Sequence, residues 1–280
     1  MKFTKMHGTG NDYVYVNLFE ETISDISDAA IRVSDRHFGI GSDGLIAIAP
    51  SDVADCRMIM YNADGTEGAM CGNGIRCVAK YAYDHDIAKK EHMTIETKSG
   101  IKTIDLTVEN GKAAYAKVNM GKAILDPKKI PVKAEGDSFI SQEIMVGDKP
   151  YTVTCVSMGN PNCVVMMEEI SKNKALHLGP YVENSKYFPN RINMQLCHVV
   201  DRENIQIEIY ERGAGYTYAS GTGACAAASA AHKLGLVGNR VQVHMQGGDL
   251  LVEFAEDDRV FMTGPVVYIG SITLAENFFA

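Results

Sequence analysis

The sequence predicts an α+β protein made of two copies of one unit, in which a strand-rich shell surrounds a helix. Short segments of alternating apolar and polar residues run through the chain, such as DYVYVNL at 12–18 and NIQIEIYERG at 204–213, and this alternation is typical of strands. Two helices stand out because each follows a turn of the same form, Cys71-Gly72-Asn73-Gly74 in one half and Ser220-Gly221-Thr222-Gly223 in the other. The repeated turn indicates a duplicated unit.

Each of the two helices is supported by apolar residues at helical spacing. These residues are Ile75, Val78, Ala79, Ala82 and Tyr83 in the first copy, and Ala224, Ala227, Ala228 and Ala231 in the second, where Gly235 ends the helix. We expect two further helices, over 25–36 and 171–176. The expected strands lie within 2–8, 12–18, 45–50, 56–62, 93–100, 102–110, 113–121, 144–160, 163–169, 193–201, 204–213, 240–248, 250–257 and 259–270.

Composition favours a globular protein with a small-molecule ligand. The chain has 280 residues, a net charge of -8 and no segment in which lysine and arginine gather, which argues against a nucleic acid or an acidic membrane as partner. No stretch approaches 18 apolar residues and the first residues do not form a signal peptide, so we expect a cytoplasmic protein. Seven cysteines without a C-x-x-C pair, and histidines without ligand spacing, predict neither a disulfide framework nor a metal site.

The paired turns suggest a chemistry. A helix N-terminus offers unpaired N–H groups and positive partial charge, so it suits a carboxylate, and a cysteine there is expected to have a lowered thiol pKa. If the two halves face each other, Cys71 and Ser220 lie on opposite sides of one ligand. Taking a proton from one face of a carbon and returning one to the other inverts the centre without a cofactor. The alternative is that Cys71 is an inert buried cysteine before a helix.

Two other patterns carry less information. The segment Gly39-Ile40-Gly41-Ser42-Asp43-Gly44 matches G-x-G-x-x-G, but a strand-like run follows it in place of a helix, which excludes dinucleotide binding. Glu211 and Arg212 place an acid and a planar cation shortly before the second turn. They are either ligand-binding residues or a surface ion pair.

Five segments, spread over nearly the whole chain, resemble the diaminopimelate epimerase family: HGTGNDYVYVN, YNADGTEGAMCGNGIRC, SMGNPNCVV, FPNRINM and YERGAGYTYASGTGACA. The resemblance implies two pseudo-symmetric domains, 1–118 plus 265–280 and 119–264, each a β-barrel-like sheet around a central helix. It places the active site in the interdomain cleft and implies neither pyridoxal phosphate nor a metal. A homodimer is plausible for the family.

The resemblance also assigns roles to single residues. Cys71 matches one of two catalytic cysteines, and Ser220 stands where the family has the second. The backbone N–H groups of Gly72, Asn73 and Gly74, and of Gly221, Thr222 and Gly223, match cradles for the carboxylate. Substrate-holding positions are matched by Asn11, Asn62, Asn160, Asn193 and Arg212, and Glu211 matches an acid that contacts an ammonium group.

Three departures from the family lie close to the chemistry. Asn162 replaces a usual histidine, Tyr216-Thr217 replaces a frequent Glu-Thr pair, and Ser220 replaces the thiol. Serine is a poor base without a strong partner. It is either a laboratory substitution for cysteine or the mark of a natural branch with a remodelled second half-site.

The resulting expectation is an isomerase that converts LL-diaminopimelate to the meso form by two-base α-proton transfer, for lysine and peptidoglycan precursor synthesis. The alternatives are a racemase or isomerase of another amino acid, such as histidine or glutamate, and a catalytically weakened binding protein that kept the cleft.

Overall fold

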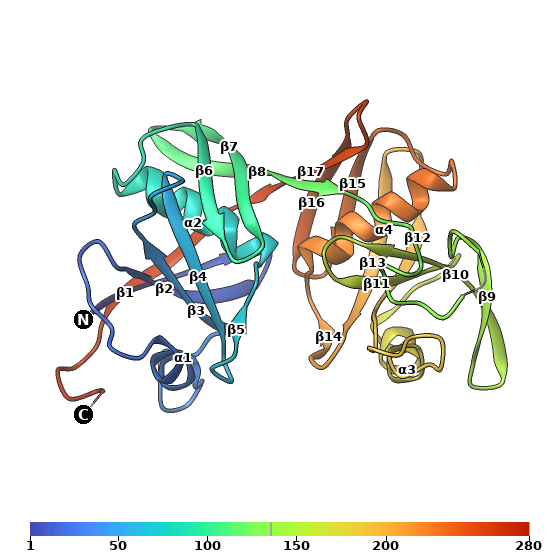
Figure 1. Ribbon diagram of the computed structural model, residues 1–280, viewed down its shortest axis with the longest axis horizontal. Helices are drawn as coiled ribbons and strands as arrows, with labels where there is room; N and C mark the ends of the chain where they lie inside the picture. The colour runs from blue at the N-terminus through green and yellow to red at the C-terminus, as the bar shows by residue number, and fades with distance from the viewer. Residues whose placement is uncertain (135, 280) are drawn as a thin grey trace. The chain divides into compact units, whose positions relative to one another are not determined.

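The computed structural model describes residues 1–134 and 136–279, and these divide into two compact units. Unit 1 comprises Met1–Asn119 and Thr263–Ala280, and unit 2 comprises Met120–Met262. The chain leaves unit 1 in β8 (Lys112–Lys122) and returns in β17 (Arg259–Pro265), as Figure 1 shows. Unit 1 therefore contains both ends of the chain.

The strands of unit 1 pair in the order β18-β1-β2-β3-β4-β6-β7-β8. The β2–β3 and β4–β6 pairs are parallel and the others are antiparallel, and a short β5 pairs with β4. Besides β8, the elements of unit 1 are β1 (Lys2–Gly8), β2 (Asn11–Asn17), α1 (Ile26–Ser34), β3 (Gly44–Ala49), β4 (Cys56–Asn62), β5 (Glu67–Gly68), α2 (Gly72–Asp84), β6 (His92–Thr97), β7 (Gly100–Glu109) and β18 (Val267–Thr273).

Unit 2 repeats this order of elements and pairings. Its strands pair as β9-β10-β11-β12-β13-β15-β16, with parallel pairs β11–β12 and β13–β15 at the equivalent places, and β14 pairs with β13 as β5 does with β4. Besides β17, its elements are β9 (Gln142–Val146), β10 (Lys149–Ser157), β11 (Pro161–Met166), α3 (Lys172–Glu183), β12 (Asn193–Val199), β13 (Asn204–Glu211), β14 (Gly215–Thr217), α4 (Gly221–Lys233), β15 (Arg240–Met245) and β16 (Gly248–Phe254). The predicted α+β fold of two similar halves is confirmed.

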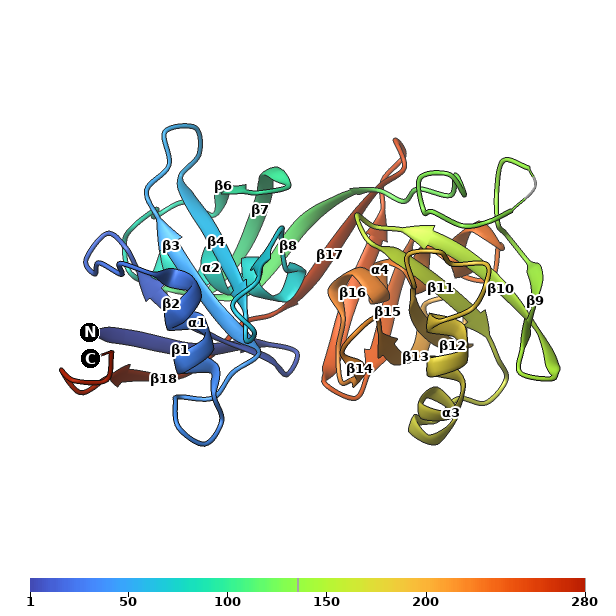
Figure 2. The same cartoon turned by 60° about the horizontal axis from the view of Figure 1, so that its bottom comes forward.

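A long helix fills the inside of each curved sheet (Figures 1 and 2). Helix α2 contacts β1, β2, β3, β4, β6 and β7, and α4 contacts the equivalent strands β10, β11, β12, β13, β15 and β16. Residues 72–83 of α2 are all buried, and the buried face of α4 consists mainly of alanine, whose small side chain lets the surrounding strands approach closely. Gly235, with a φ of 71°, ends α4 as predicted.

Both outer helices lie where the sequence predicts them, but α3 extends beyond its predicted range. Helix α1 lies within the predicted range 25–36, and Asp25 caps it by accepting from the backbone N–H of Asp28. Helix α3 was expected to end near residue 176, which is wrong, because it continues through Pro180 to Glu183. A proline removes one backbone hydrogen bond, and packing of the final turns against β12, β13 and β14 offsets that loss.

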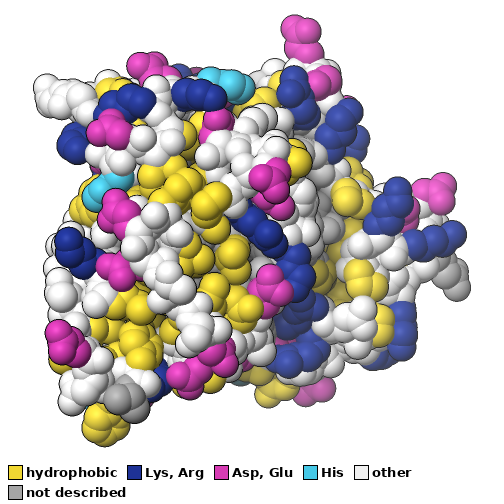
Figure 3. All heavy atoms as spheres, turned by 60° about the vertical axis from the view of Figure 1, so that its left-hand side comes forward, with side chains coloured by type: hydrophobic (Ala, Val, Ile, Leu, Met, Phe, Trp, Pro, Cys, Tyr) yellow, Lys and Arg dark blue, Asp and Glu magenta, His cyan; other side chains and the backbone are white. Residues whose placement is uncertain are grey.

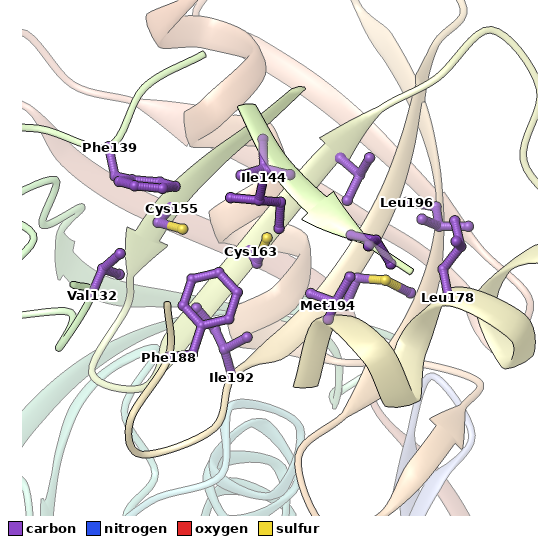
Figure 4. Close-up of a cluster of buried hydrophobic side chains, with 14 of the residues drawn as sticks. Val132, Phe139, Ile144, Cys155, Cys163, Leu178, Phe188, Ile192, Met194 and Leu196 are labelled. Atoms are coloured by element: carbon purple, nitrogen blue, oxygen red, sulfur yellow. The ribbon is translucent and has the colours of Figure 1, made fainter. Parts of the chain in front are cut away.

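Each unit has a hydrophobic core between an outer helix and the sheet. In unit 1, Ala29, Ala30 and Val33 of α1 pack against Val14 and Leu45. In unit 2, Leu178 and other α3 residues pack over Met194 and Leu196, and Phe139, Phe188 and Ile192 extend the cluster (Figure 4). Burial on both sides explains why the strands next to the helices read as continuous apolar runs in the sequence.

The surface carries apolar side chains between charged ones, as the face in Figure 3 shows. Phe38 is the most exposed large apolar residue among those described, at 86%, and Ile269 on β18 is also exposed. Scattered apolar residues are normal on a protein surface, so the homodimer stays a prediction. Within the part of the chain that the structure describes, no helix is long and apolar enough to cross a membrane.

The close packing of α3 on β13 gives a testable consequence at Gly179. An added Cβ would lie 2.2 Å from the ring of Tyr210, so Gly179→Ala forces either the ring or the helix to move. We expect the free energy of unfolding to fall by about 1–3 kcal/mol, measured by urea denaturation. Gly270→Ala is the control, because no atom lies within 4 Å of its added Cβ. A stabilised Gly179→Ala protein, as helix propensity alone would give, would contradict this packing.

Candidate active site

The first turn places Cys71 at the N-cap of α2. Its backbone is extended, with φ -126° and ψ 122°, and Sγ accepts a hydrogen bond from the N–H of Gly74 at 3.3 Å. A Cβ on Gly74 would lie 2.6 Å from Cδ1 of Ile46, so only glycine lets the helix begin this close to β3. The sulfur thus occupies the positive end of the helix.

Two asparagines lie beside the Cys71 sulfur. The thiol donates to Oδ1 of Asn11 at 3.3 Å, and Nδ2 of Asn73 donates to the same oxygen at 3.3 Å. Oδ1 of Asn73 in turn accepts from the hydroxyl of Thr9 at 3.4 Å. The structure therefore brings together three sequence-predicted site residues, Asn11, Cys71 and Asn73, in one hydrogen-bonded group.

Burial raises the pKa of the Cys71 thiol above its ordinary value. The N–H groups of Gly74 and Asn73 oppose this rise, as do the hydroxyl of Tyr13 and the guanidinium of Arg76. The expectation that the helix N-terminus lowers the thiol pKa is therefore wrong in its net direction. The N–H groups act in the expected sense, but the cost of burying a thiolate exceeds their effect.

The second turn has the same backbone form with a different cap. Ser220, with φ -144° and ψ 119°, is the N-cap of α4, and its Oγ accepts from the N–H of Gly223 at 3.2 Å. Oγ1 of Thr222 lies 3.5 Å from Oγ of Ser220 and accepts from Nδ2 of Asn160 at 3.1 Å. Unit 2 thus brings together Asn160, Ser220 and Thr222.

Asn162 does not act as a partner base for Ser220. Its Nδ2 donates to the backbone carbonyl and to Oδ1 of Asn160, at 2.8 and 3.2 Å, and its Oδ1 accepts from Nε2 of Gln195 at 3.1 Å. Asn162 and Gln195 are fully buried. This pair holds Asn160 in place, and a carboxamide has no basic nitrogen with which to activate the Ser220 hydroxyl.

Asn193 and Arg212 also lie together in unit 2. Oδ1 of Asn193 accepts from the backbone N–H of Arg212 at 2.9 Å, and Nη1 of Arg212 donates to the carbonyl of Asn190 at 2.8 Å. Glu211 ends β13 and is partly exposed. In unit 1, Asn62 ends β4 and its side chain donates to Oγ1 of Thr66 at 3.0 Å.

Each turn can bind a carboxylate and place a proton-bearing side chain beside it. The N–H groups at the start of each helix, contributed by Gly72, Asn73 and Gly74 or by Gly221, Thr222 and Gly223, include donors that the helix itself leaves unpaired. Among residues 1–134 and 136–279, no group of three or more His, Cys, Asp or Glu side chains has an arrangement that could hold a metal ion.

Sequence reasoning missed Tyr13 and Arg76. Tyr13 follows the Asn-Asp pair directly, is 5% exposed and contacts Cys71 and Asn11. Arg76 is completely buried inside α2, where Nη1 donates to the carbonyl of Gly72 at 3.4 Å. A charged residue among the apolar residues of a central helix was the available signal, because a buried arginine is rare unless it has a local task.

Comparisons with known proteins agree with the resemblance seen in the sequence. The profile of the diaminopimelate epimerase family matches residues 3–125 and 154–269. A diaminopimelate epimerase of Agathobacter rectalis is 49% identical over 98% of this chain and 100% of that protein. Another, of Methanococcus maripaludis, is 46% identical over 98% of this chain and 100% of that protein.

Solved structures show the same fold at low identity. The crystal structure of a probable proline racemase from Agrobacterium radiobacter gives a TM-score of 0.72 at 13% identity, and covers 99% of this chain and 94% of that chain. A hydroxyproline epimerase from Agrobacterium vitis gives 0.69 at 14% identity, and covers 100% of this chain and 92% of that chain. At these identities the likeness concerns the fold alone.

The raised pKa of Cys71 predicts how the thiol reacts. Alkylation requires the thiolate, so carbamidomethylation of Cys71 by iodoacetamide is expected to accelerate up to and beyond pH 9, the ordinary value of the group. Mass spectrometry of the peptide that contains residue 71 measures the rate. The other six cysteines are buried and react slowly in the folded protein. A rate that levels off below pH 8 would show that the helix N-terminus outweighs burial.

Proposed function

The chain belongs to the diaminopimelate epimerase family and is an isomerase, and on this premise we propose that it converts LL-diaminopimelate to the meso form by inverting one α-carbon. The observation that carries the proposal is the repeated turn: in each unit the side chain of the N-cap residue accepts from the N–H three residues later, at 3.3 Å for Cys71 and 3.2 Å for Ser220. Both N-cap side chains can carry a proton, and each lies beside the N–H groups of a helix start that suits a carboxylate.

The α-carboxylate of the substrate is proposed to bind the free N–H groups at the start of α2 and α4. These dipoles stabilise the negative charge that develops on the carboxylate when the α-proton leaves, and they need no reorganisation during the reaction. Glycine at residues 72, 74, 221 and 223 lets the ligand approach the backbone closely. No metal and no pyridoxal phosphate takes part in the proposed reaction.

Cys71 is proposed to be the ionisable group. A thiolate whose pKa is raised is a stronger base toward a carbon acid than a thiolate with a lowered pKa. In one direction the Cys71 thiolate takes the α-proton and becomes a thiol. The oxygen of Ser220 delivers its hydroxyl proton to the opposite face of the carbon and takes a replacement proton from water. The Cys71 thiol then gives its proton to the hydroxide that remains, which restores the thiolate.

Ser220 is proposed to be the weaker of the two groups. Its partners in unit 2 are the N–H of Gly223 and the hydroxyl of Thr222, and neither is a base. Two-base transfer through a serine is therefore expected to be slower than through a cysteine at the same place.

The residues that lie away from the two turns, Asn193, Glu211 and Arg212, favour a substrate with a second charged end. Arg212 is exposed, and its backbone N–H donates to Oδ1 of Asn193, which fixes the start of the turn at 212–214. With Glu211, these residues supply an acid and a cation that could hold the second amino-acid group of diaminopimelate. Asn62 and Asn160 complete the proposed substrate-binding set. A racemase of a simple amino acid, the alternative function, has no use for such a set.

Exchange of the α-proton tests the proposed function. The protein is incubated in deuterium oxide with diaminopimelate, and separately with histidine or glutamate, and loss of the α-proton signal is followed by NMR. Exchange with diaminopimelate is expected, and Cys71→Ala should reduce it by roughly a thousandfold or more, while Cys56→Ala, in a buried strand, should retain it. Exchange with another amino acid but none with diaminopimelate would overturn the assigned substrate.

Replacement of Ser220 tests the weak second group. Ser220→Cys is expected to increase the rate of epimerisation at least about tenfold, because a thiol is far more acidic than a hydroxyl. Under mild oxidation the same variant should form a disulfide between residues 71 and 220, detected as a loss of two hydrogens in the peptide map. A Cys71→Ala/Ser220→Cys double variant is the control. Failure of the single variant to form this bond would argue against one shared site.

A further inference from the structure

The glycine-rich segment 39–44 has no part in the proposed chemistry, yet it contacts the Cys71 half-site. It lies between α1 and β3, as the order of elements requires, and does not open a helix. The carbonyl of Gly41 accepts from the ammonium of Lys5, and Gly44 packs so closely that an added Cβ would lie 2.9 Å from the Tyr13 ring. Asp43, between these glycines, is the residue that reaches toward the site.

Asp43 uses both carboxylate oxygens. Oδ2 accepts from Nδ2 of Asn11 at 2.7 Å and from the backbone N–H of Asp12 at 3.2 Å. Oδ1 pairs with Nη2 of Arg36 at 2.9 Å. The bond to Asn11 is the shortest of these contacts, and Asn11 is also the side chain that accepts from the Cys71 thiol.

The hydrogen bond between Asn11 and Asp43 decides which end of the Asn11 carboxamide faces Cys71. The two ends of a carboxamide have nearly the same shape, so its partners decide which end points where. An ionised carboxylate can only accept, and it therefore draws the NH₂ of Asn11 toward Asp43 and turns the carbonyl toward Cys71. The NH₂ of Asn73 then donates to the Asn11 carbonyl, and the hydroxyl of Thr9 donates to the Asn73 carbonyl. Each donor in this chain points toward the next residue on the way to Asp43.

The equivalent carboxamide in unit 2, that of Asn160, has the opposite orientation. Asn11 begins β2 and Asn160 directly precedes β11, and Tyr13 follows Asn11 by two residues as Asn162 follows Asn160. There the donor is Nδ2 of Asn162, and Oδ1 of Asn160 accepts from it, so the NH₂ of Asn160 points to Thr222 in the turn. The carboxamide whose NH₂ meets a carboxylate, that of Asn11, is therefore the one whose carbonyl faces its turn.

We propose that Asp43 is a positioning residue, which holds the Asn11 carboxamide with its carbonyl toward the Cys71 thiol and thereby keeps the thiol proton directed and available. The inference rests on the proposed function, because it assigns to Cys71 the role of acid and base. Without the carboxylate, the carboxamide is free to turn its NH₂ to the sulfur. That NH₂ favours the thiolate over the thiol and removes the acceptor that orients the proton.

The test compares two neutral variants of Asp43. Asp43→Asn retains one carbonyl oxygen that can accept from Asn11, whereas Asp43→Ala retains none, so the pair separates loss of charge from loss of the acceptor. The midpoint of the pH profile for iodoacetamide alkylation of Cys71 is measured in each. We expect the midpoint in Asp43→Ala to lie about one pH unit below that in Asp43→Asn. The α-proton exchange of Asp43→Ala should be roughly tenfold or more slower than that of Asp43→Asn.

Equal alkylation midpoints in the two folded variants would overturn the proposal, because a residue with only a structural role would not move this midpoint selectively. Asp43→Leu, which keeps volume but has no acceptor, repeats the comparison if circular dichroism shows that Asp43→Ala is unfolded. Absence of diaminopimelate exchange in the unaltered protein would defeat the proposed function alone, since the alkylation midpoints still report the orientation of Asn11.

Discussion

The start of a buried helix is the constraint on which the rest of this structure depends. The first N–H groups of α2 and α4 have no partner within the helix, and the sheets around both helices exclude most of the water that could serve instead. The N-cap side chain satisfies one of these groups, and a bound anion can satisfy others. In the proposed reaction the same requirement brings a thiol or hydroxyl next to the substrate carboxylate, and it requires glycine where strand side chains come close.

The two units have the same backbone conformation at the N-cap turn, but different polar groups surround it. In unit 1 the cap is a thiol flanked by a carbonyl, a buried tyrosine and a buried arginine. In unit 2 the cap is a hydroxyl, and the neighbouring carboxamides of Asn160, Asn162 and Gln195 bond to one another and to Thr222. Proton transfer at neutral pH needs a group whose two protonation states are both accessible. Of the two N-cap side chains, the Cys71 thiol comes closer to this than the Ser220 hydroxyl, which makes the proposed reaction chemically asymmetric.

The sequence predicted well those features that depend on local pattern. Alternation gave the strands, the spacing after each Gly-x-Gly turn gave α2 and α4, and the matched segments gave the family. Features that depend on the balance of opposing effects were not predictable in this way. Helix α3 continues through Pro180 because tertiary contacts outweigh one lost hydrogen bond, and the Cys71 thiol has a raised pKa because burial outweighs the helix N-terminus. The role of Asp43 was not predictable either, because its contact with Asn11 joins residues that are 32 positions apart in the chain.

The proposed reaction requires that a thiol and a hydroxyl, one from each unit, act on opposite faces of the same carbon. The most direct measurement is the isotope content of substrate and product in the first few per cent of the reaction in deuterium oxide, with the two stereoisomers separated before mass spectrometry. We expect deuterium at the α-carbon of the product while the remaining substrate still carries hydrogen, because the donor on the second face exchanges with solvent and never receives the substrate proton. Product that retains the original hydrogen would show that one group serves both faces, and would rule out transfer between two groups.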